Sequence, residues 1–217
     1  TIYSFDLFFH GQSYWAHKDL PLTKTVLQHV IQVFLDYFQI QGFSIITYSL
    51  GGKFGLSIAE AFTHRIDTLI MIASDGFVIS PWYKLATAYA PTRHMLKYFV
   101  FKPDLYFSIT RYLNKLHLIP NATIRFAELN MATMGLRRKV YLAWVVFRKL
   151  QVDIPALCAA LNQHGIKVEF YFGSRDTLIP MEKIKKASKS LTRRKIVVLD
   201  CSHSKVLQEY AKLSPTA

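Results

Sequence analysis

The segment from Phe43 to His64 combines an apolar run, a tight turn and an amphipathic pattern. The run FSIITY is aromatic or β-branched at all but one position and predicts a buried strand. The residues KFGLSIAEAFTH have apolar side chains at helical spacing and predict a helix. Ser49 lies between them, beside Gly51 and Gly52. A serine in an ordinary connection of this kind caps the helix. The sequence therefore predicts a sharp strand-to-helix turn with Ser49 in it.

Strands and helices alternate along much of the rest of the chain. Helical spacing covers residues 22–40, and buried-strand composition covers residues 66–74. Farther along, the pattern predicts a helix at 154–164, a strand at 166–172, a helix at 181–190, a strand at 195–200 and a helix at 204–211. This alternation predicts an α/β protein whose mostly parallel sheet is flanked by helices on both faces. The opening residues, TIYSFDLFF, predict a further interior strand.

The alternation stops between residues 77 and 153, where the sequence is helical in pattern and rich in aromatic residues. Proline is poorly tolerated beyond the first turn of a helix, so four prolines divide this stretch into short helices: Pro81, Pro91, Pro103 and Pro120. We expect an inserted α-helical lid. The predicted organisation is a first part of the core at 1–76, the lid insertion at 77–153 and a second part of the core at 154–217.

Composition limits the class of protein. With 217 residues, of which 51% are hydrophobic, the chain can bury a sizeable core. No stretch of the sequence is long and apolar enough to predict a membrane span. The two cysteines, Cys158 and Cys201, lie in different predicted elements. They fit reduced packing residues better than a disulfide framework.

The net charge of +13 is concentrated in the predicted lid, which has twelve Lys and Arg residues against three Asp and Glu residues. A basic cluster attracts nucleic acid, anionic lipid or anionic substrates, or is simply a solvated face. No zinc-ligand spacing, RNA-binding signature or basic zipper is present in the sequence, so we expect no nucleic-acid partner. A membrane surface stays open as a partner of the basic lid.

The strand, the residues TYSLGG and the helix after them resemble the nucleophile elbow, G-x-S-x-G, of the α/β-hydrolases. The resemblance places Ser49 at the nucleophile, Gly51 at the second glycine and Gly52 directly after it. Thr47 occupies the position of the first glycine, which adds a side chain where strand and helix crowd together. The backbone N–H of Leu50 takes the place of one oxyanion-hole donor.

Two later segments resemble the other catalytic segments of this family, in the chain order serine, acid, histidine. FYFGSRDTLIP has Asp176 at the position of the acid, and VVLDCSHSKVLQE has His203 at the position of the base. Taken singly, the three residues have plainer readings as a capping serine, a loop aspartate and a surface histidine. The rival acid is Asp200, and the rival bases are His10, His17 and His164.

The segment Asp6–Ser13 resembles the D-x-x-G-x-G-x-S element of the same family, with Phe9 in place of the first glycine. By this resemblance, the segment lies beside the elbow strand. The first strands of the family, with the loop that gives the second oxyanion donor, are then expected upstream of Thr1.

The resemblance implies a serine hydrolase, without metal or cofactor, that cleaves an ester-type bond of a small-molecule substrate through an acyl-enzyme intermediate. The aromatic residues of the lid favour an apolar acyl or aryl group; they are Trp82, Tyr83, Tyr89, Tyr98, Phe99, Phe101, Tyr106 and Phe107.

Several alternatives remain open at this point. The same fold supports a non-catalytic binding protein, and the basic lid suits a peripheral membrane hydrolase that acts on lipid. Thioester hydrolysis, carbon–carbon bond hydrolysis and acyl transfer use the same three groups. We expect a cytoplasmic location, and the sequence leaves the oligomeric state open.

Overall fold

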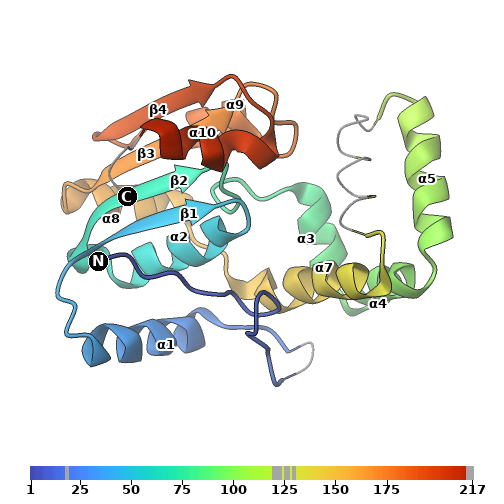
Figure 1. Ribbon diagram of the computed structural model, residues 1–217, viewed down its shortest axis with the longest axis horizontal. Coiled ribbons are helices and arrows are strands. Elements are labelled where there is room, and N and C mark those ends of the chain that lie inside the picture. Colours follow the sequence, from blue (N-terminus) through green and yellow to red (C-terminus); the bar gives the residue numbers. More distant parts are fainter. Residues whose placement is uncertain (18–19, 119–123, 125–127, 129–130, 214–217) are drawn as a thin grey trace. The chain divides into compact units, whose positions relative to one another are not determined.

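The computed structural model describes residues 1–17, 20–118, 124, 128 and 131–213 (Figure 1). Two compact units are present. One, here called the helical unit, combines Thr1–Leu22 with Ser80–Lys149, and the other, the sheet unit, combines Thr23–Ile79 with Leu150–Ala217. The division expected from the sequence, after residues 76 and 153, stays a prediction.

The sheet unit contains a four-stranded sheet in which all neighbouring strands are parallel. In spatial order the strands are β1 (Phe43–Tyr48), β2 (Ile66–Ile72), β3 (Lys167–Gly173) and β4 (Arg194–Leu199). The predicted α/β class and parallel sheet are confirmed. Every residue of β3 after Lys167 is buried, as expected for a strand that is covered on both faces. On the edge strand β1, burial alternates and Ile46 is 55% exposed, so only one face of this strand is covered.

The helices of the sheet unit flank these strands (Figure 1). They are α1 (Lys24–Tyr37), α2 (Gly51–Ala61), α8 (Ile154–Gln163), α9 (Met181–Ala187) and α10 (Val206–Leu213), with the short 3-10 turns η1 (Thr63–Arg65) and η3 (His203–Lys205). Helix α2 packs on the sheet face that carries Thr47, and α10 packs on the opposite face, where the rings of Tyr210 and Tyr171 are 4.7 Å apart. The sequence therefore predicted the elements of this unit correctly, with small shifts at their ends.

The helical unit contains α3 (Pro81–Ala88), α4 (Ala90–Phe101), α5 (Pro103–Lys115), α7 (Met134–Val146) and the 3-10 turn η2 (Phe147–Lys149). The first three helices each have a proline in their first turn. Proline is tolerated there because a backbone N–H in the first turn has no acceptor within the helix. This confirms the predicted division into short helices at Pro81, Pro91 and Pro103; Pro120 lies outside the described residues. Helices α4 and α7 pack together through Val100, Tyr141 and Val145.

The predicted interior strand at TIYSFDLFF is wrong. Residues 1–17 contain no strand, and the backbone makes turn hydrogen bonds instead, from Phe9 N to Ser13 O and from Ser13 N to His10 O, both 3.0 Å. An extended segment becomes a strand only where a neighbouring backbone supplies ladder hydrogen bonds. The ring of Phe9 packs against Phe147, 5.8 Å away, within the helical unit. The position of Asp6–Ser13 beside the elbow strand stays a prediction.

Phe9 replaces the first glycine of the D-x-x-G-x-G-x-S element, but its backbone keeps a conformation typical of glycine. Phe9 has φ = +70°, the left-handed conformation that glycine adopts most easily, although it carries a side chain. Gly11 has φ = +51°, and a Cβ there would lie 1.9 Å from Asp6 Oδ2. The segment therefore keeps a glycine-type turn at the position where the sequence has replaced the first glycine.

Two further expectations concern single residues and membrane spans. Cys158 and Cys201 are both free and buried, which confirms their prediction as packing residues.

In the part of the chain that the structure describes, the helices are all too short or too polar to cross a lipid bilayer.

Candidate active site

Ser49 lies in the turn between β1 and α2 with φ = +48°. A residue with a side chain rarely adopts this conformation, which costs about 1–3 kcal/mol and persists only where the surroundings hold it. Three backbone hydrogen bonds do so here. Ser49 N donates to Ile72 O (3.2 Å), and Ser49 O accepts from Asp75 N (2.8 Å) and Gly52 N (3.0 Å). The turn therefore projects the Ser49 side chain from a backbone that is fixed on both sides.

The two glycines after Ser49 differ in what the fold requires of them. A Cβ on Gly52 would lie 2.0 Å from Asp75 O and 2.8 Å from Ser74 Cβ, so this position has no room for a side chain. A Cβ on Gly51 would meet no atom within 4 Å among the described residues beyond its own helix and chain neighbours. Lys53 also ties α2 to the loop after β2, because its Nζ is 3.1 Å from Asp75 Oδ2. Burial lowers the pKa of Lys53, and Asp75 offsets part of that effect.

Thr47, at the position of the first motif glycine, is accommodated by a glycine elsewhere. Its side chain is buried, and its Oγ1 is 2.7 Å from Ser74 Oγ. A Cβ on Gly55, one turn into α2, would lie 2.2 Å from Thr47 Cγ2. In the family motif, the first glycine leaves room between the strand and the helix. In this chain Thr47 occupies that position, and Gly55 on the helix leaves the room instead.

We expect Gly55→Ala to lower the free energy of unfolding by about 1–3 kcal/mol, because the added methyl group overpacks against Thr47. Thr47→Ser removes the contacting methyl group and keeps the hydroxyl, so it should restore most of that loss when it is combined with Gly55→Ala. Urea denaturation of the two single variants and the double variant measures this coupling. If the changes in the free energy of unfolding are additive, Gly55 does not make room for Thr47 and the interpretation is contradicted.

The structure brings Ser49, His203 and Asp176 together in one hydrogen-bonded chain. Ser49 Oγ is 3.0 Å from His203 Nε2, and His203 Nδ1 is 2.7 Å from Asp176 Oδ2. The three residues follow β1, β4 and β3, respectively, at the carboxyl edge of the sheet, where functional groups of open α/β sheets gather. All three lie in the sheet unit.

The surroundings of Asp176 keep its carboxylate in place. Its side chain is only 2% exposed. The second oxygen, Oδ1, accepts hydrogen bonds from the backbone N–H groups of Leu178 (2.8 Å) and Ile179 (3.2 Å). Oδ2 is thereby directed at His203, whose Nδ1–H donates to it. This arrangement leaves Nε2 as an acceptor for the Ser49 hydroxyl.

Tyr48 is a neighbour of this group that the sequence reasoning did not single out. Its hydroxyl donates to the backbone oxygen of His203 (3.2 Å), and the two rings stack with centroids 5.6 Å apart. Burial, and secondly the charge of Asp176, raise the pKa of Tyr48, so the phenol stays protonated and keeps its donor. An aromatic residue directly before the serine is a weak sequence signal, because strands commonly contain tyrosine.

The rival candidates have other contacts. Asp200 accepts from Ser174 Oγ (3.0 Å), lies 3.6 Å from Arg175 Nη2 and is 86% exposed. His10 and His17 belong to the helical unit, and His164 is an exposed residue at the end of α8. Asp176, and not Asp200, is therefore the acid that His203 contacts. Among the described residues, no group of three or more His, Cys, Asp or Glu side chains is placed to hold a metal ion.

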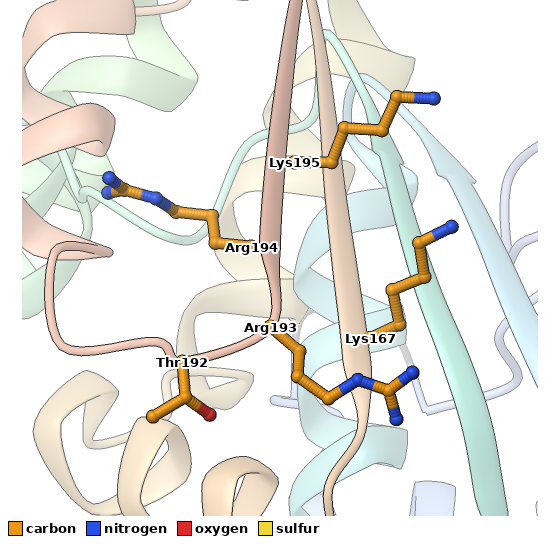
Figure 2. A pocket seen from close by; sticks show the side chains of 5 residues that line it. All are labelled: Lys167, Thr192, Arg193, Arg194 and Lys195. Atoms are coloured by element: carbon orange, nitrogen blue, oxygen red, sulfur yellow. The ribbon is translucent and has the colours of Figure 1, made fainter.

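A basic cavity of about 250 Å³ lies at the opposite edge of the sheet, where β3 and β4 begin; it is lined by Lys167, Thr192, Arg193, Arg194 and Lys195 (Figure 2). Figure 2 shows Arg194 pointing away from Arg193 and Lys195, to the other side of β4. Several of its cations already have partners. Arg193 donates to Gly165 O (2.5 Å), and Lys167 pairs with Glu169 (2.5 Å). The cavity therefore belongs to the edge of the sheet where β3 and β4 begin, and it is separate from the Ser49 site at the carboxyl edge.

The chain has the α/β-hydrolase fold. It is similar to an α/β hydrolase enzyme from a Medee basin deep-sea metagenome library, at 18% identity over 96% of this chain and 75% of that chain, with a TM-score of 0.63. A carboxylesterase of the thaumarchaeon Nitrososphaera gargenis is 16% identical over 96% and 75% of the two chains, with a TM-score of 0.55. A thermophilic esterase from Thermogutta terrifontis is 13% identical over 90% and 70%, with a TM-score of 0.58. No family model and no curated protein sequence matches the chain.

Proposed function

We propose that this chain is a serine hydrolase that cleaves an ester-type bond of a small, apolar substrate through an acyl-enzyme intermediate. The observation that carries the proposal is the continuous hydrogen-bonded chain from Ser49 Oγ through His203 to Asp176, which begins at a strained turn. A serine hydroxyl is a weak nucleophile until a neighbouring base takes its proton. The geometry supplies that base at hydrogen-bonding distance.

In the proposed reaction, Ser49 Oγ attacks the substrate carbonyl carbon while His203 Nε2 takes the hydroxyl proton. Asp176 stabilises the resulting imidazolium and keeps its ring oriented. When the tetrahedral intermediate collapses, the bond to the leaving oxygen breaks and His203 returns the proton to that oxygen. Water then attacks the acyl group on Ser49 with the same proton transfers, which releases the acid and restores the serine.

Negative charge on the carbonyl oxygen needs hydrogen-bond donors that are already in place. The backbone N–H of Leu50, directly after the nucleophile in the turn before α2, is the donor that we assign within this chain. A second donor upstream of Thr1 stays a prediction. Losing one oxyanion donor typically lowers the rate by about a hundred- to a thousandfold. We therefore expect the Leu50 donor to contribute a factor of about this size to kcat.

The solved structures with this fold that are described above are named as a hydrolase, a carboxylesterase and an esterase, which supports hydrolysis as the type of reaction. A serine at the elbow, rather than an aspartate, favours acyl transfer. The preference for an apolar substrate is an inference from the aromatic residues of 77–153. The role of that segment as a lid, its docking on a membrane surface and the cytoplasmic location stay predictions.

Labelling with a fluorophosphonate probe tests the proposal directly, because the probe reacts with serines that are activated by a neighbouring base. We expect a single labelled peptide containing Ser49 and no labelling of Ser49→Ala. Ser57→Ala is the matched control. Ser57 lies in α2, and its buried hydroxyl has no hydrogen-bond partner in the described part of the chain, so its loss should leave labelling unchanged. A folded protein that stays unlabelled would favour the non-catalytic alternative.

A further inference from the structure

The helical unit contains a cavity of about 890 Å³ of its own. Its walls come from three parts of this unit: the irregular segment at residues 9–16, helix α4 and helix α7. Cavities of this size hold small-molecule ligands in many proteins. All of its described lining residues belong to the helical unit, so the cavity is defined without reference to the Ser49 site.

One side of this cavity is apolar. Val100 and Tyr141, which are buried in the contact between α4 and α7, line it together with Leu142. Two further apolar residues line it and remain largely uncovered, Phe101 at 60% exposed and Met134 at 45% exposed. Large apolar side chains gathered at a concave surface and left exposed to water mark a binding site for an apolar group.

Two cations lie on the same faces of the helices as this apolar surface. Lys97 precedes Val100 and Phe101 by three and four positions on α4, and Arg138 lies four positions after Met134 on α7. Residues at these spacings are neighbours on one helix face. None of the described lining residues is acidic. The described lining therefore combines apolar side chains with two cations and no acidic residue.

The neighbouring Arg137 shows that the two adjacent arginines of α7 have different roles. Its side chain donates to Val100 O and Met131 O, both 2.8 Å away, and so fastens α7 to α4 and to the chain before it. Arg138, one position later, is exposed and lines the cavity. Only the second of the two is thus placed to meet a ligand.

We propose that this cavity binds an anionic amphiphile, with its apolar chain against Val100, Tyr141 and Leu142 and its anionic head held by Lys97 and Arg138. The planar guanidinium of Arg138 suits a carboxylate or a phosphate head, both of which can accept two parallel hydrogen bonds. An uncharged apolar ligand binds less tightly, because it makes no ion pair with Lys97 or Arg138, which are both exposed. The site is argued from the helical unit alone and does not depend on Ser49 being a nucleophile.

Calorimetric titration of the full chain carrying Ser49→Ala tests this site while preventing turnover of any ligand. The ligands are dodecanoate, dodecyl phosphate and 1-dodecanol, all kept below the concentrations at which they aggregate. We expect at least one of the two anions to bind at least about tenfold more tightly than the alcohol, since a charge-assisted hydrogen bond contributes about this factor or more. The two anions distinguish a carboxylate head from a phosphate head.

The variants separate the two parts of the proposed site. Lys97→Gln with Arg138→Gln should lower the affinity for the anion about tenfold or more and leave the affinity for the alcohol unchanged. Lys102→Gln with Lys139→Gln removes the same charge from residues of the helical unit that do not line the cavity, and should change neither affinity. Phe101→Ser should weaken the binding of all three ligands, and because Phe101 is 60% exposed we expect the variant to fold.

Equal affinities for anion and alcohol, or equal losses in the two charge variants, would overturn the assignment of the head group. Absence of binding by all three ligands to the folded protein would overturn the site. Neither result bears on probe labelling at Ser49, so the two proposals fail separately.

Discussion

Alanine at Ser49 and alanine at His203 are each expected to lower kcat for a p-nitrophenyl ester by up to about a million-fold, with the double variant no slower than either single one. In the proposed mechanism the serine and its base act as one unit: Ser49 Oγ is 3.0 Å from His203 Nε2, and removal of either group would remove the proton transfer. Steady-state rates of the three variants, corrected for spontaneous hydrolysis, measure this. Multiplicative losses would show that the two residues act independently.

The two aspartates near His203 give a sharper comparison. Asp176→Asn should lower kcat by about ten-thousandfold, because an amide cannot stabilise the imidazolium or hold the required tautomer. Asp200→Asn should change kcat less than about twofold, since Asp200 is an exposed partner of Ser174 and Arg175. Both variants remove one carboxylate from the same edge of the sheet. A comparable loss in both would mean that the sequence and the geometry had identified the wrong acid.

Alanine at Gly52 is expected to destabilise the protein by more than about 3 kcal/mol and to abolish labelling of Ser49. The added Cβ would lie 2.0 Å from Asp75 O, a backbone atom that cannot move freely, because Asp75 N is hydrogen-bonded to Ser49 O. Relief of the contact must therefore disturb the turn itself.

Gly51→Ala is the matched control for this substitution, one position away in the same motif. Its Cβ would point into open space among the described residues, and alanine favours helix more than glycine does, so we expect a change within about 1 kcal/mol. Urea denaturation and probe labelling of both variants provide the comparison. Similar destabilisation by the two alanines would mean that the turn does not depend on the close approach at Gly52.

The sheet unit was predictable because buried parallel strands are continuous apolar runs and amphipathic helices have a clear period. The same criterion failed at TIYSFDLFF, where Phe9 packs against Phe147 and Phe8 against Trp15, and no strand forms. Composition does not reveal whether a neighbouring backbone is present to pair with an extended segment.

The residues of the candidate site were predictable to different degrees. Ser49, Asp176 and His203 could be selected by motif and by chain order, and the structure places His203 within hydrogen-bonding distance of both Ser49 and Asp176. Gly55 and Tyr48 could not be selected in this way. Their importance comes from contacts with Thr47 and with the backbone of His203, and these contacts exist only once strand, helix and the last loop have come together.

Ser49, His203 and Asp176 all belong to the sheet unit, whereas the cavity with Lys97 and Arg138 belongs to the helical unit. In genetic terms, the segments that would break the bond and those that would select a ligand are read from separate stretches of the gene. Residues 80–149 contain none of the residues of the turn at Ser49, and neither His203 nor Asp176. Mutagenesis libraries confined to that stretch would sample new ligand preferences of the cavity without altering Ser49, His203 or Asp176.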